Sequence, residues 1–278
     1  MFFFPLYDDN PSGKKPIITW LIITLCLLIF IFQQNLNIFY GNRFIYSFGL
    51  VPSFLINPSN IPKNFIDIHP FFTLFTSAFL HAGWMHFLGN MLYLWIFGDN
   101  VEDAFGTLRF IFFYLFCAVS GGFLQVLFNP ESITPMVGAS GAIAGILGSY
   151  LILYPKANIR VFVWIIIFFR TVNIPAWLVL GIWIMGQFIS APSSLSNDGG
   201  GVAYFAHIGG FLAGLIITMI MKRLNFLSLS ITESIPWETR KTRKEDFKFI
   251  LTHNVQSSVP SFHRRKKGSV PVSKRKTK

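Results

Sequence analysis

Long apolar stretches separated by shorter polar connections fill the first 221 residues of the chain. A helix needs roughly 20 mostly apolar residues to cross about 30 Å of hydrocarbon. Six stretches approach this requirement, although two of them are short. They cover residues 17–32, 84–97, 108–128, 137–154, 175–189 and 202–221. The pattern predicts a bundle of six transmembrane helices.

Three connections between these stretches carry further information. Residues 161–169 are apolar but too few to span a bilayer, and Arg160 and Arg170 flank them, so we expect an interfacial or partly inserted connector. Residues 33–83 form a long connection that mixes apolar and aromatic side chains with Pro and Asn. The Ser- and Gly-rich segment 190–201 indicates a flexible linker after the fifth stretch.

Composition agrees with a polytopic membrane protein. The chain is 53% hydrophobic and 13% charged, with a mean hydropathy of +0.54, which is unlike a water-soluble domain. Its two cysteines, Cys26 and Cys117, both lie in expected spans, so neither a disulfide framework nor a cysteine metal cluster is indicated. The N-terminal residues show no secretory signal with a cleavage site.

The net charge of +11 comes from the end of the chain. Residues 1–221 contain 8 Lys and Arg and 8 Asp and Glu, whereas residues 222–278 contain 15 and 4. We interpret residues 222–278 as a disordered cytoplasmic tail that is attracted to anionic lipid. The clustering of the charges favours this interpretation over nucleic-acid binding.

Basic residues also predict the orientation of the bundle. Lys14 and Lys15 precede the first span, others lie in the second and fourth connections, and the tail adds fifteen; the opposite side receives Arg43 and Lys63. Both termini are therefore expected in the cytoplasm. Spans two, four and six then run inward, which places their N-terminal ends at a common depth on the outer side.

Polar residues gather at that depth. His86 and Asn90 are four residues apart, which puts both side chains on one face of span two. His81 falls off this face and is expected to make structural hydrogen bonds. Taken alone, the pair of His86 and Asn90 is more typical of interhelical hydrogen bonds that hold a bundle together.

Ser140 lies at the outer end of span four, in the sequence Gly138-Ala-Ser-Gly141. Small residues in membrane helices mostly serve close packing, and Gly145 and Gly148 fit that role. The first turn of a helix leaves backbone N–H groups without partners. These donors and the helix dipole could stabilise an oxyanion formed beside the serine.

His207 lies near the outer end of span six, three residues before Gly210 of a Gly210 and Gly214 GxxxG face. Small residues let a neighbouring helix approach, so this imidazole could accept a proton from a hydroxyl group there. Water would reach the site through a polar cavity that is open to the outer side. We expect this cavity to be lined by His81, His86, Asn90, Ser140 and His207.

These residues resemble the rhomboid intramembrane serine proteases. The matching motifs are, in order, H-x4-H-x3-N at 81–90, GASG at 138–141 and AHIGGFLAG at 206–214. Supporting matches are GLVP at 49–52, FGDNVEDAFG at 97–106, and VNIPAWLVLGIWIMGQ ahead of span six. The resemblance covers roughly residues 40–221, and it implies that residues 33–83 lie partly in the outer interface as short helices.

The resemblance implies an all-α membrane protein with a six-transmembrane-helix, rhomboid-like bundle and both termini in the cytoplasm. Residues 1–16 would form an N-terminal segment, 17–221 the protease domain and 222–278 the tail. It implies a serine endopeptidase that uses no cofactor or metal and cuts transmembrane protein substrates in or near their membrane segments. A multi-pass protein of the bacterial inner membrane is expected by analogy, and the oligomeric state is left open.

The resemblance also implies roles for single residues. Ser140 would be the nucleophile and His207 the general base. Oxyanion donors, packing glycines and supporting residues would complete the site. The oxyanion donors would be His86 and Asn90 with the Ser140 backbone N–H. The packing glycines would be Gly138 and Gly141, and the supporting residues would be His81 and Gly210.

One position departs from the family's pattern. Some members carry a Tyr four residues after the serine, where it stacks on the catalytic histidine, and here that residue is Ala144. Another side chain must therefore orient His207, and the sequence does not identify it. Because no Asp or Glu lies in the outer halves of spans four and six, a Ser/His dyad is expected in place of a triad.

Two other functions stay open. One is a catalytically silent rhomboid-like protein that binds membrane clients without cutting them, although the presence of both Ser140 and His207 argues against it. The other is a transporter or metal-binding protein that uses His81, His86 and His207. Against that alternative, no intramembrane carboxylate accompanies these histidines, and no repeat relates the two halves of the chain.

Overall fold

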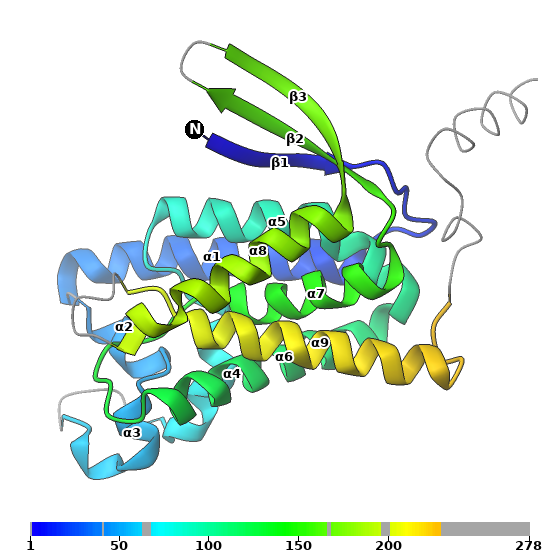
Figure 1. Ribbon diagram of the computed structural model, residues 1–278. Helices are drawn as coiled ribbons and strands as arrows, with labels where there is room; N and C mark the ends of the chain where they lie inside the picture. Colours follow the sequence, from blue (N-terminus) through cyan, green and yellow to red (C-terminus); the bar gives the residue numbers. More distant parts are fainter. Residues whose placement is uncertain (1, 41, 63–67, 166–167, 196–200, 229–278) are drawn as a thin grey trace, which may run out of the picture. The chain divides into compact units, whose positions relative to one another are not determined.

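The computed structural model describes residues 2–40, 42–62, 68–165, 168–195 and 201–228 (Figure 1). The described part is mostly helical, which confirms the main expectation from the sequence. Six long helices carry the six apolar stretches. They are α1 (Ile17–Tyr40), α5 (Trp84–Phe105), α6 (Thr107–Phe128), α7 (Ser140–Leu153), α8 (Ala176–Ser190) and α9 (Tyr204–Arg223). The expected tail lies outside the described residues from 229 on.

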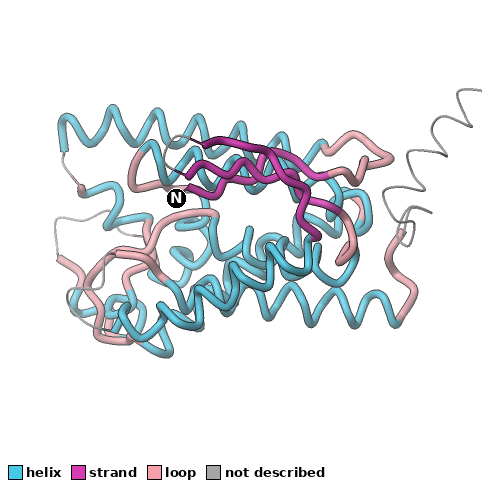
Figure 2. Tube along the Cα trace, turned by 45° about the horizontal axis from the view of Figure 1, so that its top comes forward, coloured by secondary structure: helices cyan, strands magenta, loops and turns pink. Residues whose placement is uncertain are grey.

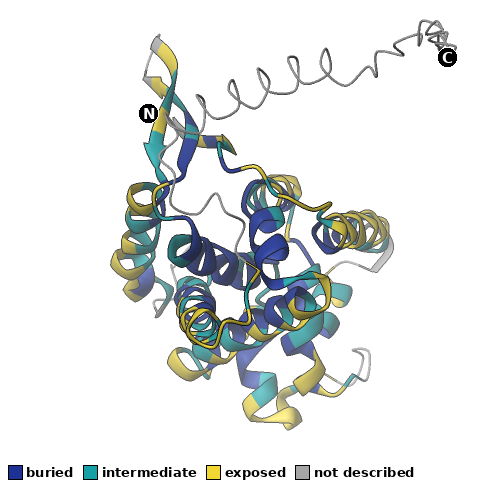
Figure 3. Ribbon diagram, turned by 90° about the vertical axis from the view of Figure 1, so that its right-hand side faces the viewer, coloured by how far each residue is buried: buried dark blue, intermediate teal, exposed yellow. Residues whose placement is uncertain are grey.

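Four of these helices, namely α1, α6, α8 with the turn η4 (Ala191–Leu195), and α9, are long and apolar enough to cross a membrane. Helix α7 has 14 residues, and at a rise of 1.5 Å per residue it is about 21 Å long. Most of its residues are buried among the neighbouring helices (Figure 3). Because protein surrounds it, its ends need not meet lipid.

Helix α9 packs directly on the backbone of α7 at glycine positions. A Cβ atom at Gly214 would lie 2.0 Å from the carbonyl oxygen of Gly145, and one at Gly148 would lie 2.3 Å from the carbonyl oxygen of Phe211. A larger residue at either position would therefore force the two helices apart. The predicted packing role of Gly145 and Gly148 is confirmed.

Short helices connect α1 to α5, as the resemblance implies for residues 33–83. They are α2 (Arg43–Phe48), α3 (Pro52–Ile56), η1 (Pro58–Asn60), η2 (Pro70–Phe72), α4 (Thr73–Thr76) and η3 (Ser77–Phe79). Leu50 and Met136 exchange two backbone hydrogen bonds, with N···O distances of 3.0 and 2.7 Å. This bridge ties the connection to the loop that leads into α7.

A three-stranded antiparallel sheet takes the place of the expected connector after α7 (Figure 2). Strands β2 (Asn158–Ile165) and β3 (Phe168–Pro175) form a hairpin, and β1 (Phe2–Asp8) pairs with β2. The expectation of an all-α fold was therefore wrong, while the expected interfacial position of residues 161–169 stays a prediction. The β-branched and aromatic residues of this segment favour strands, and β2 pairs with β3 on one side and with the distant N-terminal strand β1 on the other.

The end of α5 holds the beginning of α1. The Glu102 carboxylate accepts hydrogen bonds from the backbone N–H groups of Ile18 and Thr19, at 2.9 and 2.8 Å, and from the Thr19 hydroxyl at 2.9 Å. These backbone groups belong to the first turn of α1, where N–H groups have no partner within the helix. The carboxylate therefore caps α1 and also meets the positive end of its dipole.

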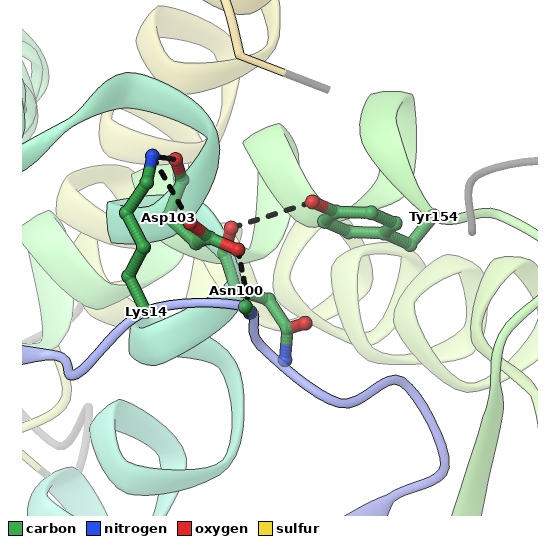
Figure 4. A network of polar contacts seen from close by, with 5 residues as sticks. Lys14, Asn100, Asp103 and Tyr154 are labelled. Atoms are coloured by element: carbon green, nitrogen blue, oxygen red, sulfur yellow. Dashed lines mark hydrogen bonds and ion pairs between the residues drawn. The ribbon is translucent and has the colours of Figure 1, made fainter. Parts of the chain in front are cut away.

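The neighbouring polar contacts extend this junction to α7 (Figure 4). Lys14 forms an ion pair with Asp103 at 3.4 Å, and the Gly13 backbone N–H donates to the same carboxylate at 2.7 Å. The Tyr154 hydroxyl, just after α7, donates to the Asn100 carbonyl at 3.4 Å. The start of α1 and the ends of α5 and α7 thus share one level of the bundle.

Candidate active site

The opposite end of α7 borders a cavity of about 470 Å³, which residues of α5, α7, α8 and α9 line together. Four of the five predicted polar residues line it, which confirms their expected convergence. They are His86, Asn90, Ser140 and His207. No Asp or Glu belongs to this lining among the residues that the structure describes.

Ser140 is the first residue of α7, and its side chain is partly exposed to the cavity. The first backbone hydrogen bond into the helix runs from Ile143 N–H to the Ala139 carbonyl at 2.9 Å. The N–H groups at the start of the helix precede this bond and have no partner within α7. The serine therefore lies beside backbone donors at the positive end of a helix dipole, as predicted.

His207 reaches the same cavity from the first turn of α9. The glycine at position 210 lies directly on the backbone of Gly141, which brings the two helix ends together. Among the described contacts, no hydrogen bond joins Ser140 to His207. Catalytic hydrogen bonds are often longer before a substrate is bound.

His86 and Asn90 approach the loop before Ser140 from α5. A Cβ atom at Gly138 would lie 2.7 Å from the His86 Nε2 atom and 3.6 Å from the Asn90 Nδ2 atom, so both side chains pack on this glycine. Gly138 has φ of +127°, a backbone conformation that side chains disfavour. Glycine is therefore required here by the backbone and by the close approach of the histidine ring.

The hydrogen bond of His86 assigns its proton. The Ala82 backbone N–H donates to His86 Nδ1 at 3.4 Å, so the neutral ring carries its proton on Nε2, the atom beside Gly138. Asn90 Nδ2 uses one of its two protons for the His86 carbonyl at 3.1 Å. Two N–H donors are thus available beside the loop that precedes Ser140.

His81 is not a lining residue, and this part of the prediction was wrong. Its side chain is fully buried, and its ring makes T-shaped contacts with the rings of Phe30 and Phe87. Its backbone exchanges two hydrogen bonds with the Gln33 side chain, at 2.5 and 3.2 Å. These contacts hold the turn that enters α5, so the backbone of His81 makes the structural hydrogen bonds expected of its side chain.

Gln187 is the residue at the site that the sequence did not identify. Its Oε1 atom lies 2.7 Å from His207 Nδ1. The Trp183 ring, one turn earlier on α8, lies 5.8 Å from the His207 ring between centroids. The spacing of four residues places both side chains on one face of α8, and both are within the VNIPAWLVLGIWIMGQ motif.

Comparison with known proteins places this geometry in a family context. The family described as "Rhomboid domain" matches residues 69–224. "Rhomboid protease GluP" of Bacillus subtilis is 30% identical over 205 residues, which cover 73% of this chain and 34% of that protein. "Rhomboid-like protein 11, chloroplastic" of Arabidopsis thaliana is 27% identical over 242 residues, covering 82% and 72%.

A third relative, "Rhomboid-like protease 5" of Toxoplasma gondii, is 32% identical over 149 residues, which cover 52% of this chain and 16% of that protein. The chain spans about a third of the length of the Bacillus protein and of "RHOMBOID-like protein 1" of Arabidopsis thaliana. The matched residues 69–224 contain every residue named above at the cavity.

Proposed function

Because the chain belongs to the rhomboid family of integral membrane proteins, we propose that it is an intramembrane serine endopeptidase. One observation carries this proposal. The hydroxyl of Ser140, the imidazole of His207 and the donors of His86 and Asn90 line one cavity at the N-terminal end of α7. A nucleophile, a base and oxyanion donors are the groups that acyl transfer requires.

The proposed reaction has two halves. His207 Nε2 accepts the hydroxyl proton as Ser140 Oγ attacks the carbonyl carbon of the scissile peptide bond. The C–N bond then breaks, and the leaving amine takes the proton from His207. In the second half, His207 removes a proton from water, which attacks the acyl-enzyme, and the proton returns to Ser140 as the carboxylic product leaves.

The oxyanion formed in both halves would lie beside the N-terminal end of α7. His86 Nε2–H, Asn90 Nδ2–H and the Ser140 backbone N–H are the proposed donors. Loss of one such donor typically lowers the rate by about 10²- to 10³-fold, or about 2.7 to 4 kcal/mol. The site works as a dyad in this proposal, because its described lining contains no carboxylate that could act as the third member.

The substrates would be transmembrane proteins. An intact helix keeps its backbone carbonyl groups in hydrogen bonds, so the segment to be cut must unwind locally before it can enter the cavity. Gly, Pro or polar residues near the scissile bond would make this unwinding easier. The apolar majority of the cavity lining, which includes Met85, Tyr93 and Trp183, suits apolar side chains of such a segment.

The proposed topology has all six long helices within the membrane, both termini in the cytoplasm and the cavity open to the outer side. It rests on the charge distribution of the sequence and on the parallel course of α5, α7 and α9. Lys14 and the end of α9, with Lys222 and Arg223, would lie on the cytoplasmic side.

Labelling with a fluorophosphonate probe tests the activity directly. We expect the purified wild-type protein to react and Ser140→Ala not to react, and His207→Ala to react much more slowly because the serine loses its base. The same two variants should insert normally but fail to cleave a model transmembrane substrate. A wild-type protein that neither reacts nor cleaves would instead support the client-binding alternative.

A further inference from the structure

Gln187 is placed to control the catalytic histidine. Its Oε1 atom is 2.7 Å from His207 Nδ1, while its Nε2 atom donates to the Trp183 carbonyl at 3.3 Å, within α8. The second hydrogen bond decides which end of the amide faces the imidazole. The Trp183 carbonyl oxygen needs a donor, which the amide nitrogen is and the amide oxygen is not, so the amide oxygen must face His207. The group that meets His207 is therefore an acceptor.

An acceptor at Nδ1 selects the tautomer of a neutral imidazole. The ring nitrogen that donates to Gln187 must carry the proton, which leaves the lone pair on Nε2. A general base for Ser140 needs that lone pair on the nitrogen that faces the serine. The amide thus supplies the orientation that a carboxylate supplies in a serine protease triad, without adding a charge.

We propose that Gln187 is a positioning residue that holds His207 in its Nδ1–H tautomer and so keeps Nε2 available to Ser140. The proposal deepens the proposed protease function and rests on it. It also identifies a side chain that orients His207, which Ala144 cannot do because alanine has no ring to stack on the histidine. Trp183 lies against the His207 ring, but no hydrogen bond between the two side chains is among the described contacts, so Trp183 bears on the position of the ring and not on its tautomer.

A purely structural role is the competing explanation. Helix α8 buries 17% of its apolar stretch, against 33% to 50% for α1, α6 and α9, so a polar contact with α9 could simply hold it in place. The tautomer of His207 and the pH dependence of catalysis distinguish the two explanations. Loosening of α8 would change protein stability, but it would not by itself exchange the protonated nitrogen.

Nitrogen-15 NMR of histidine-labelled protein tests the tautomer without relying on activity. The chain has six histidines, and the His207 signals are identified by their loss in His207→Ala. We expect a protonated Nδ1 in the wild type and a shift toward protonated Nε2 in Gln187→Leu, which replaces the amide with an apolar side chain of similar size. A wild-type His207 that is protonated on Nε2 would overturn the proposal, whether or not the protein is a protease.

Kinetics of purified variants provide the second test. We expect Gln187→Leu to lower kcat by about 10- to 100-fold with KM within about 2-fold, because general-base catalysis contributes about 10²- to 10⁴-fold. Gln187→Glu keeps the acceptor and should retain at least several times the kcat of Gln187→Leu. Its carboxylate would also stabilise the imidazolium, so the acid limb of its pH–rate profile should move upward by about one pH unit.

The titratable groups that face His207 from other positions are His86 on α5 and Tyr204 on α9. Both are retained in every variant, so the difference between the profiles reports on position 187. Thr218→Val is the matched control, since the hydroxyl groups of Thr218 on α9 and Ser149 on α7 are hydrogen-bonded at 2.8 Å, far along the helices from the cavity. It removes a buried hydrogen bond and should leave kcat and the profile unchanged.

Several outcomes would overturn the positioning role. They are a wild-type kcat in folded Gln187→Leu, or, if that variant does not fold, a Gln187→Glu profile that superimposes on the wild-type profile. A fall in kcat for Thr218→Val equal to that for Gln187→Leu would likewise assign the effect to helix packing. Failure of the wild type to cleave would contradict the protease function, while the NMR measurement would still decide the tautomer.

Discussion

Gly210 of α9 rests on the carbonyl oxygen of Gly141 in α7, and a Cβ atom at Gly210 would lie 1.9 Å from that oxygen. Gly141 follows Ser140 directly, and His207 lies one helical turn before Gly210. The backbone contact between the two glycines therefore determines how closely the serine and the histidine can approach. Gly141 and Gly210 therefore serve helix packing and also bring the two residues of the proposed dyad together.

Gly210→Ala should disrupt both packing and catalysis. The added methyl group must push α9 away from α7, and overpacking of this kind typically costs about 1 to 3 kcal/mol. The separation would also move His207 from Ser140, so we expect a loss of cleavage larger than the loss of folded protein. Unfolding in detergent and single-turnover cleavage measure the two effects separately.

Gly181→Ala is the matched control for this substitution. Gly181 lies in α8, and no heavy atom lies within 4 Å of a Cβ atom built there. Alanine should be tolerated at this position and should improve helix propensity by about 1 kcal/mol at most. If Gly210→Ala and Gly181→Ala have the same stability and the same cleavage rate, the close contact between Gly210 and Gly141 is needed for neither.

Asn90→Ala should lower the cleavage rate by about 10²- to 10³-fold, because one proposed oxyanion donor is lost. Its stability should change less, since the Asn90 side chain makes one local hydrogen bond, to the His86 carbonyl. Rates per folded molecule, with active molecules counted by fluorophosphonate labelling, test this prediction. Ser149→Ala removes a buried hydroxyl far along α7 from the cavity, so it should lower stability and leave the cleavage rate unchanged. A collapse of folded yield in Asn90→Ala at an unchanged rate would favour the interhelical hydrogen-bonding interpretation.

The long helices could be predicted because apolar composition and membrane thickness determine them almost without tertiary information. Their ends could not: α1 continues to Tyr40 and α5 to Phe105, through polar residues that a count of apolar residues excludes. The Glu102 carboxylate shows why, because its partners lie at the start of α1, more than 80 positions away. A distant contact of this kind leaves no local pattern in the sequence.

The sheet and Gln187 escaped prediction for the same physical reason. Residues 161–169 carry strand-forming side chains, and β3 is a local partner for β2, but the second partner of β2 is β1, which lies at the other end of the chain. Gln187 was visible as a polar residue in an apolar stretch, but its partner His207 is on another helix, 20 residues on. The three motifs of the proposed active site could be found because each carries its characteristic residues within a few positions.

Glu102→Ala should destabilise the bundle by about 1 to 3 kcal/mol, since it leaves three buried donors at the start of α1 without their acceptor. The activity of the folded fraction should stay near the wild-type value, because Glu102 lies at the end of the bundle away from the cavity. Glu102→Gln keeps one acceptor oxygen and should recover part of the loss. Thermal unfolding in detergent, read beside the cleavage rate, would contradict this if the rate fell and stability did not.

Asp8, at the end of β1, gives the N-terminal segment a dependence on pH. Its carboxylate accepts hydrogen bonds from the Tyr150 hydroxyl and from Asn100 Nδ2, the latter at 3.0 Å. Burial raises the pKa of Asp8 from 3.8 to about 8, and the nearby Asp99 and Asp9 add to the shift. Between these two values the folded state holds a proton that the unfolded state has released.

The contribution of the protonated Asp8 to folding stability is therefore complete below about pH 4, declines as the pH rises and is absent above about pH 8. Asp8→Asn removes the titrating group and should flatten this decline, which thermal unfolding at pH 5, 7 and 9 can measure. Thr171→Ala, which breaks the 3.0 Å contact with Arg160 between β2 and β3, should lower stability by the same amount at each pH. If the stability of Asp8→Asn falls with pH as steeply as that of the wild type, a group other than Asp8 causes the decline, and this prediction is wrong.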